Sequence, residues 1–323
     1  MKTKTKVILI VVLLLLGLLF GVGAMVYPLI AARYSETVRS EVHTEYEQIL
    51  AEKDDAEINA ILEAAIAYNR KLYLREIAVA TKEDIEKSGY WDQMNIEGSD
   101  VMCYLRIPAI SLELPVYHGI GEDSLTAGCG HMPQSSLPVG GENTHAVLSA
   151  HTGMATSAMF SNLPMLKVGD IFFVDVLGET LTYEVYNIPE PVLPHEIDLI
   201  QIQSGEDLCT LITCYPFGVN THRFLVQGKR IPTPDQEEID KALSTLNSER
   251  DDFSIYEAEY FSSVMTGVGI ILCFCLLALL LILILRRKKK KSSVSATAVP
   301  PAAFSDETSD SADCREEKPS EQL

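Results

Sequence analysis

The sequence predicts an all-β domain, a barrel or a sandwich, that lies between two apolar segments. Short β-prone runs alternate with breaks of Gly, Pro, Asn and Ser across residues 99–232, a spacing typical of these folds. Much of the 323-residue chain lies outside this region, so one globular domain of ordinary size is expected. The strands are expected at residues 103–107, 114–117, 146–150, 171–177, 180–186, 208–214 and 223–231.

Two apolar segments, residues 7–30 and 263–285, are each expected to cross a bilayer, which takes about 20 helical residues. Lysines in residues 1–6 precede the first segment, and six consecutive basic residues follow the second. The positive-inside rule then places both termini in the cytoplasm and the rest outside, on a two-pass protein of the cell membrane. A cleaved signal peptide is the alternative for the first segment, although its apolar core exceeds the roughly 7–15 residues usual for one.

The other parts of the chain are predicted as follows. Residues 31–98 are expected to form a helical stalk and a possible lid region: residues 35–73 carry apolar side chains at helical spacing, with a break at Asp54 and Asp55, and residues 77–98 are polar and loop-like. Residues 233–262 form an acidic linker. Residues 286–323 begin with the basic run, which anchors the chain at anionic lipid, and continue as a tail too polar to fold.

Charge and cysteine spacing exclude several classes of function. The formal net charge of −19 argues against nucleic acid as a partner, because phosphate binding needs a basic surface. No Cys-x-x-Cys occurs among the seven cysteines, and we expect neither a metal nor a cofactor. Buried hydrophobic roles are expected for three cysteines, with disulfide or ligand roles as the alternative; these are Cys103, Cys129 and Cys209.

Three residues that carry chemistry stand at predicted strand ends. Cys214 ends one β-prone run, Arg223 opens the next, and His151 follows the run 146–150. A cysteine nucleophile, a proton-transfer group and an oxyanion donor are often assembled in this way. Arginine stays protonated and cannot be the base, so its planar fork suits an oxyanion, while His151 moves protons. His222 is the rival histidine, but neighbouring strand residues face opposite sides.

The run Thr210 to Cys214, with Arg223 downstream and His151 upstream, resembles the signature of the sortases, the cysteine transpeptidases of Gram-positive cell surfaces. The order of segments, with an apolar segment at each end, most resembles the class C sortases, which assemble pili. The resemblance implies an eight-stranded β-barrel, preceded by an α-helical N-terminal region and flanked by two transmembrane helices, with catalytic residues His151, Cys214 and Arg223.

The resemblance also implies the reaction and its partners. Cys214 would cleave an LPXTG-like sorting signal after its Thr, hold an acyl-thioester and pass it to a pilin lysine amine. Three alternatives stay open. They are a sortase that anchors surface proteins to a peptidoglycan precursor, a wall-directed cysteine peptidase in which water resolves the thioester, and a surface scaffold without activity in which Cys214 is inert.

A lid over the active site is a further expectation. Class C sortases usually carry an Asp-Pro-aromatic motif before the barrel, and no such triplet occurs in residues 77–98. Trp91 and Asp92 are the nearest substitutes in kind, and we take them as possible lid residues. A packing role for the tryptophan is the alternative.

Overall fold

The computed structural model describes residues 2–152, 157–196, 198–235 and 267–271, with residues 278 and 282. The chain divides into two compact units, one of residues 18–267 and one of residues 1–17 and 268–323. Within the described ranges, no helix combines the length and the apolar character needed to cross a membrane. Most of the predicted second span, most of the acidic linker and the whole tail lie outside those ranges, whereas the predicted first span, residues 7–30, lies in a described helix. Both spans stay predictions.

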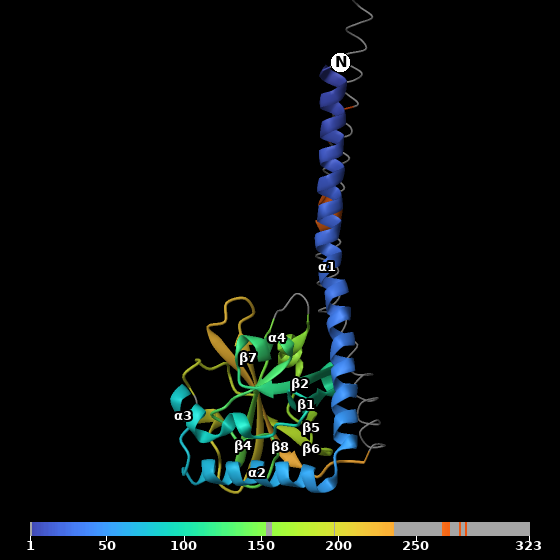
Figure 1. The fold of residues 1–323 in the computed structure, drawn as a ribbon. Coiled ribbons are helices and arrows are strands. Elements are labelled where there is room, and N and C mark those ends of the chain that lie inside the picture. The colour runs from blue at the N-terminus through green and yellow to red at the C-terminus, as the bar shows by residue number, and fades with distance from the viewer. Residues whose placement is uncertain are drawn as a thin grey trace, which may run out of the picture. The chain divides into compact units, whose positions relative to one another are not determined.

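Eight strands close into a barrel in the order β1-β2-β3-β4-β7-β8-β6-β5 (Figure 1). The all-β prediction is confirmed, and of the two predicted architectures the fold is the barrel and not the sandwich. Only two neighbouring pairs, β2 with β3 and β4 with β7, run parallel. The strands are β1 (Val101–Ile107), β2 (Leu112–His118), β3 (Cys129–His131), β4 (Thr144–Ser149), β5 (Ile171–Val176), β6 (Glu179–Asn187), β7 (Asp207–Tyr215) and β8 (His222–Ile231).

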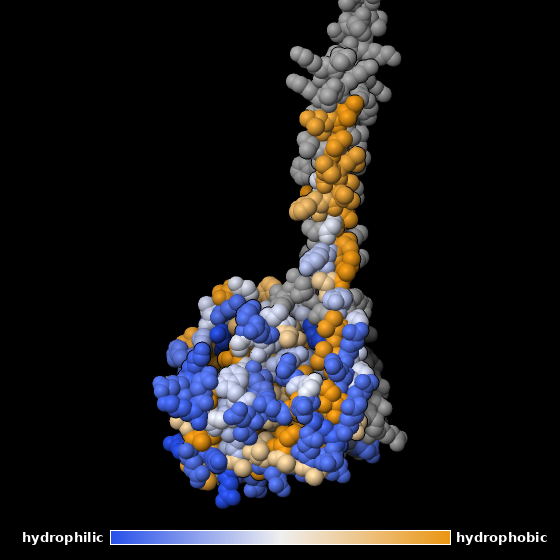
Figure 2. Space-filling model, in the orientation of Figure 1, coloured by the Kyte–Doolittle hydropathy of each residue, from blue (hydrophilic) through white to orange (hydrophobic). Residues whose placement is uncertain are grey.

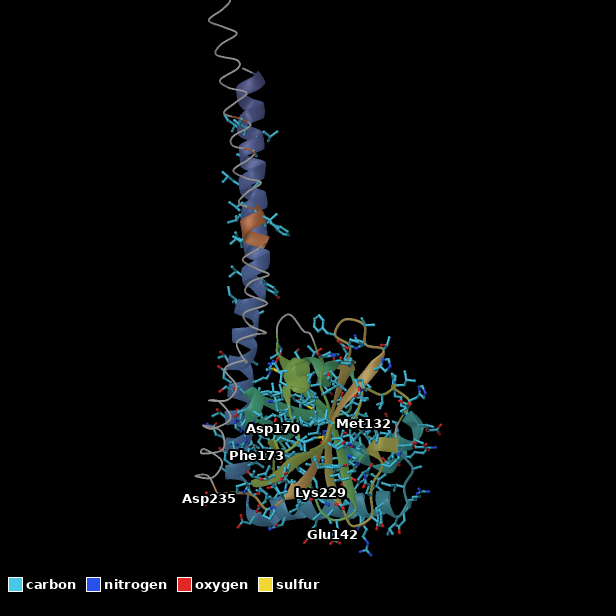
Figure 3. The ribbon with its side chains drawn as sticks, turned by 180° about the vertical axis from the view of Figure 1, so that it is seen from behind. Met132, Glu142, Asp170, Phe173, Lys229 and Asp235 are labelled. Carbon is cyan, nitrogen blue, oxygen red and sulfur yellow. The ribbon has the colours of Figure 1, made fainter. Side chains whose placement is uncertain are left out.

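Side chains fill the inside of the barrel, as Figure 3 shows. Gly228 on β8 has no side chain because Phe172 from β5 occupies the adjacent space, and a Cβ there would overlap its ring. Three thiols belong to this core and none is in a disulfide, as predicted; they are Cys103, Cys129 and Cys209. Burial raises the pKa of each of these thiols, which keeps them protonated.

Helices precede the barrel and pack against it. They are α1 (Lys2–Glu52), α2 (Asp55–Tyr73) and α3 (Lys82–Ser88), and α4 (Glu122–Ala127) lies between β2 and β3. The predicted break is confirmed, since Asp54 caps α2 by accepting a hydrogen bond from the Glu57 amide at 2.7 Å. Figure 2 shows an exposed apolar surface along α1, which includes Leu19 and Phe20.

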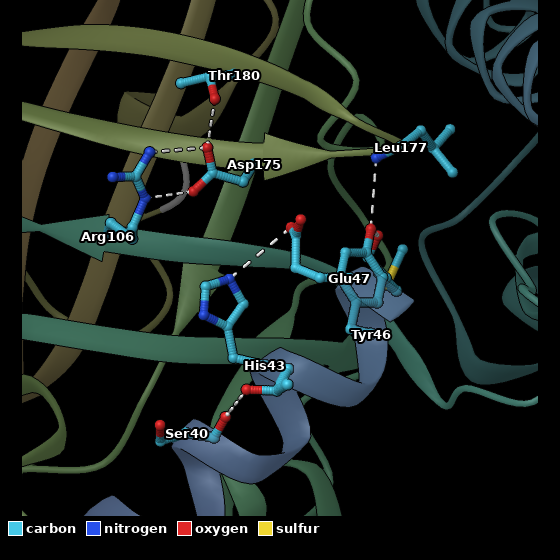
Figure 4. A network of polar contacts seen from close by, with 10 residues as sticks. Ser40, His43, Tyr46, Glu47, Arg106, Asp175, Leu177 and Thr180 are labelled. Atoms are coloured by element: carbon cyan, nitrogen blue, oxygen red, sulfur yellow. Dashed lines mark hydrogen bonds and ion pairs between the residues drawn. The ribbon is translucent and has the colours of Figure 1, made fainter. Parts of the chain in front are cut away.

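The last turns of α1 are joined to the barrel by Tyr46, which is buried (Figure 4). Its hydroxyl donates to the Met102 carbonyl at 3.3 Å and accepts from the Leu177 amide at 3.4 Å. The rings of His43 and Tyr104 lie 4.4 Å apart. This part of the predicted stalk is therefore packed on β1 and β5 and is not a free-standing helix.

Short 3-10 helices complete the described fold. They are η1 (Tyr90–Asp92), η2 (Pro108–Ile110), η3 (Met159–Met165) and η4 (Asp198–Ile200).

Candidate active site

Cys214 and Arg223 lie side by side on neighbouring strands. In the antiparallel pair β7 and β8, Cys214 stands directly opposite Arg223. Directly opposed residues of an antiparallel pair project from the same face of the sheet. Residues 216–221 connect the two strands, which turn back on each other after Tyr215.

His151 is brought to the same place by the parallel pairing of β4 with β7. The register runs from Thr144 opposite Asp207 to Ser149 opposite Ile212. Beyond the last residue of β4, the Thr213 hydroxyl donates to the Ala150 carbonyl at 2.8 Å, so the pairing continues. His151 is two residues past Ser149 and Cys214 is two residues past Ile212, which puts them at equivalent positions.

The register therefore aligns Cys214 on β7 with Arg223 on β8 on one side and, on the other side, with His151, two residues beyond the end of β4. Neighbouring strands lie about 4.8 Å apart, so the predicted nucleophile Cys214 has the histidine on one side and the arginine on the other. We call His151, Cys214 and Arg223 the catalytic row. One correction concerns the strand before His151, which ends at Ser149, two residues earlier than the histidine.

The catalytic row faces the outside of the barrel. Leu211 and Val226 point into the main core, whereas their neighbours Ile212 and Leu225 belong to a second, smaller apolar cluster with Val147. Since strand residues alternate between faces, the row lies on the same outer face as this second cluster. Four partly buried apolar side chains cover the cluster; they are Met132 (labelled in Figure 3), Val192, Leu199 and Ile200.

The connection between β6 and β7, residues 188–206, forms a wall beside the row and is held at three points. Val192 and Arg223 exchange two backbone hydrogen bonds of 2.7 and 3.0 Å. Gln227 donates through Nε2 to the Leu199 carbonyl at 2.6 Å. His145 Nδ1 lies 2.9 Å from the carbonyl of Gln201. An apolar, anchored wall next to a nucleophile suits an extended peptide with apolar side chains.

The polar groups of the row stay accessible. The His151 side chain is 30% exposed, and its Nε2 lies 4.0 Å from the carboxylate of Glu122, which is 84% exposed. Solvent screens such a contact strongly. Arg223 Nη1 donates to the carbonyls of Asn220 at 3.2 Å and His222 at 3.0 Å. These two bonds use one nitrogen of a side chain that has five N–H donors.

The structure gives the following surroundings for the other residues that the sequence singled out. The rival His222 is opposite Tyr215 on β8, and alternation turns it to the face opposite that of Arg223. Trp91 lies on η1, with its ring 5.0 Å from that of Tyr90 and 6.3 Å from that of His118. These contacts are packing contacts, and a lid role for Trp91 and Asp92 stays a prediction.

Sequence reasoning missed the residues that align the row. Thr213 joins the end of β7 to Ala150, and Gln227 fastens the wall. A threonine and a glutamine in β-prone runs carry no signal of such a role. The role depends on hydrogen-bond partners that lie 63 residues from Thr213 and 28 residues from Gln227 in the sequence.

The barrel region is similar to known proteins. The sortase domain model matches residues 105–231. The chain is 30% identical to sortase A of Streptococcus agalactiae serotype III over 113 residues, which is 34% of this chain and 45% of that protein. It thus spans less than half the length of that curated relative.

Solved structures match over more of their length. Sortase C of Streptococcus pneumoniae is 40% identical, with a TM-score of 0.54 over 60% of this chain and 100% of that one. Clostridium perfringens sortase C with the C-terminal cell wall sorting motif is 38% identical, with a TM-score of 0.52 over 59% of this chain and 97% of that one.

Proposed function

Because this chain belongs to the sortase family of cysteine transpeptidases, we propose that it cleaves an LPXTG-like sorting signal and joins it to a pilin lysine. The observation that carries the proposal is the catalytic row, in which Cys214 stands between His151 and Arg223 beside an apolar wall. The similarity to sortase C structures over nearly their whole length supports the pilus class.

In the first step, the Cys214 thiol passes its proton to His151, and the sulfur attacks the carbonyl carbon of the signal's threonine, so that a C–S bond forms. The carbonyl oxygen becomes an oxyanion, which the Arg223 guanidinium stabilises by donated hydrogen bonds. His151 gives a proton to the departing glycine amine as the C–N bond breaks. An acyl-thioester on Cys214 is left.

In the second step, the lysine amine attacks the thioester carbonyl. His151 takes a proton from the incoming nitrogen, Arg223 again holds the oxyanion, and the C–S bond breaks to return the Cys214 thiolate. The product is an amide between the threonine carboxyl and the lysine side chain. Protons and bonds balance over the two steps without a metal or a redox partner.

A second candidate uses the same row with a different acceptor. The similarity to a sortase A favours it, and in that case the amine belongs to a peptidoglycan precursor. The two candidates differ only in the nucleophile of the second step, so acceptor competition separates them.

The proposal includes a place in the cell. Residues 7–30 and 263–285 would anchor the chain in the membrane, with the barrel facing the wall and both termini in the cytoplasm. Protease added outside intact protoplasts should cleave between the two segments and spare an epitope placed after Leu323. Loss of that epitope would overturn the orientation.

The chemistry is tested with the full-length chain in detergent, an LPXTG peptide and equal amounts of a lysine-bearing pilin peptide and a peptidoglycan-type amine. Mass spectrometry should show an acyl group on the Cys214 peptide and then an amide to lysine. Cys214→Ala should give neither product, and Cys209→Ala, on the same strand but buried, is the matched control. Only hydrolysed peptide would favour the peptidase alternative, and no acyl-enzyme would refute the proposal.

A further inference from the structure

The strand that leads to His151 has an incomplete partner on one side. Strand β4 pairs with β3 at only two positions, where Ser149 stands opposite Gly130 and Leu148 opposite His131. The segment that follows β3 continues the pairing with backbone hydrogen bonds. The Met132 amide donates to the Val147 carbonyl at 2.9 Å, and the Ser136 amide donates to the His145 carbonyl at 3.0 Å.

Two buried serine hydroxyls complete this edge. The Val147 amide donates to Ser135 Oγ and the His145 amide donates to Ser136 Oγ, each at 3.0 Å. These amides would pair with carbonyl oxygens if another strand lay here. The position of β4 therefore depends on where the Ser135–Ser136 turn is held.

The turn is held by His131, whose side chain has no exposed surface. Its Nε2 lies 2.8 Å from the Ser136 carbonyl and 3.3 Å from Ser135 Oγ. A carbonyl oxygen can only accept, so Nε2 carries the proton. Burial lowers the pKa of His131 to about 4, the ring is neutral near pH 7, and Nδ1 must be an acceptor.

Tyr90 supplies the donor to that acceptor. Its buried hydroxyl lies 2.9 Å from His131 Nδ1 and 3.3 Å from the His131 carbonyl, so the ring nitrogen is the nearer acceptor of its proton. The hydroxyl oxygen itself accepts from the Gly119 amide at 3.0 Å. The tyrosine thus selects the tautomer whose other nitrogen binds the serine turn. The hydrogen bonds thus form a series in which each group donates to the next: the Gly119 amide to the Tyr90 hydroxyl, this hydroxyl to the His131 ring, and the ring to the Ser136 carbonyl.

We propose that Tyr90 and His131 are positioning residues for the catalytic row: they hold the Ser135–Ser136 turn, and through it the strand that sets His151 beside Cys214. The inference rests on the proposed function and adds residues that contact neither substrate nor the row. Only Ala150 separates Ser149, the end of β4, from His151. A shift of the strand is therefore passed directly to the imidazole.

The test uses the full-length chain with four variants. His131→Leu removes both ring nitrogens, whereas His131→Gln keeps an amide N–H to donate to the Ser136 carbonyl. Tyr90→Phe removes the hydroxyl alone. Asn69→Ala is the control, because Asn69 is equally buried and binds both backbone groups of Leu137 (2.7 and 3.0 Å), beside the turn but not on β4.

Two readouts are compared, kcat and KM with an LPXTG peptide, and the alkylation rate of Cys214 by iodoacetamide against pH. A displacement of about 1 Å can cost about 10²-fold. We expect His131→Leu to lose about 10²-fold in kcat with KM unchanged and to alter the alkylation profile. The kcat of His131→Gln should be about tenfold or more above that of His131→Leu, and the kcat of Tyr90→Phe should lie between those of His131→Leu and the wild type. The kcat of Asn69→Ala should stay within about threefold of the wild type.

Three results would overturn the inference: a glutamine variant no better than leucine, an equal kcat loss in Asn69→Ala, or an unchanged alkylation profile in folded His131→Leu. If the leucine variant does not fold, Tyr90→Phe with normal kcat and a normal profile overturns it. A wild-type chain that transfers no acyl group refutes the proposed function instead, and the alkylation profile still decides the positioning.

Discussion

Acidification should destabilise the barrel through the buried imidazole of His131. Burial is the main cause that lowers its pKa to about 4, and the hydrogen bond to the Ser136 carbonyl opposes this only in part. In the unfolded chain the pKa returns to about 6.5. Between these values the unfolded state binds a proton that the folded state does not, so this stability is complete above about pH 6.5 and is lost as the pH falls toward 4.

The magnitude follows from the two pKa values. Integrating proton binding from about pH 7.5 to about pH 4.5 gives a loss of about 2.5 kcal/mol for this one group. A loss of that size is large against a total stability of about 5–15 kcal/mol. Burial also lowers the pKa of His118 and of His145, which adds in the same direction. Burial raises the pKa of Asp207, which acts in the opposite direction.

A comparison with His131→Gln isolates the imidazole, because glutamine does not titrate. The free energy of unfolding is measured in urea at both pH values, with fluorescence of Trp91, the only tryptophan, as the signal. Its ring lies 5.0 Å from that of Tyr90, which binds His131. The wild type should lose about 2.5 kcal/mol more than the variant. Equal losses in both proteins would refute the assignment of a neutral buried His131.

Three further results are expected. Arg223→Lys should fail nearly as badly as Arg223→Ala, about 10²–10³ in kcat, because lysine keeps the charge but not the planar fork; near-normal turnover would remove the arginine from the oxyanion site. His151→Ala should lower kcat by about 10²–10⁴-fold and His222→Ala much less; a larger loss of kcat in His222→Ala would show that the wrong histidine was chosen. Among the described thiols, iodoacetamide should label Cys214 in the folded protein, and peptide mapping should find three others modified only after unfolding; they are Cys103, Cys129 and Cys209.

The identity of the catalytic candidates could be predicted because their signals are local. Cys214 and Arg223 each stand in a β-prone run, and the two strands that hold them, β7 and β8, are found within about one residue of their predicted bounds. Strand β3 was missed, since its three residues include Gly130 and have no apolar alternation. Gly130 is needed there because a Cβ would overlap the carbonyl oxygen of Gly119, and only the folded chain brings that oxygen close.

The sequence alone determined seven of the eight strands, the buried thiols and the residue types proposed for the row, because periodicity and residue chemistry act within a few positions along the chain. Only the tertiary structure decided that β4 and β7 run parallel in a register that matches Ser149 with Ile212. That register joins residues 63 apart, and no local pattern encodes it. The same holds for His131, which the sequence presents as an ordinary loop histidine. Its tautomer and its bond to the serine turn exist only because folding removes it from water and places Tyr90 against it.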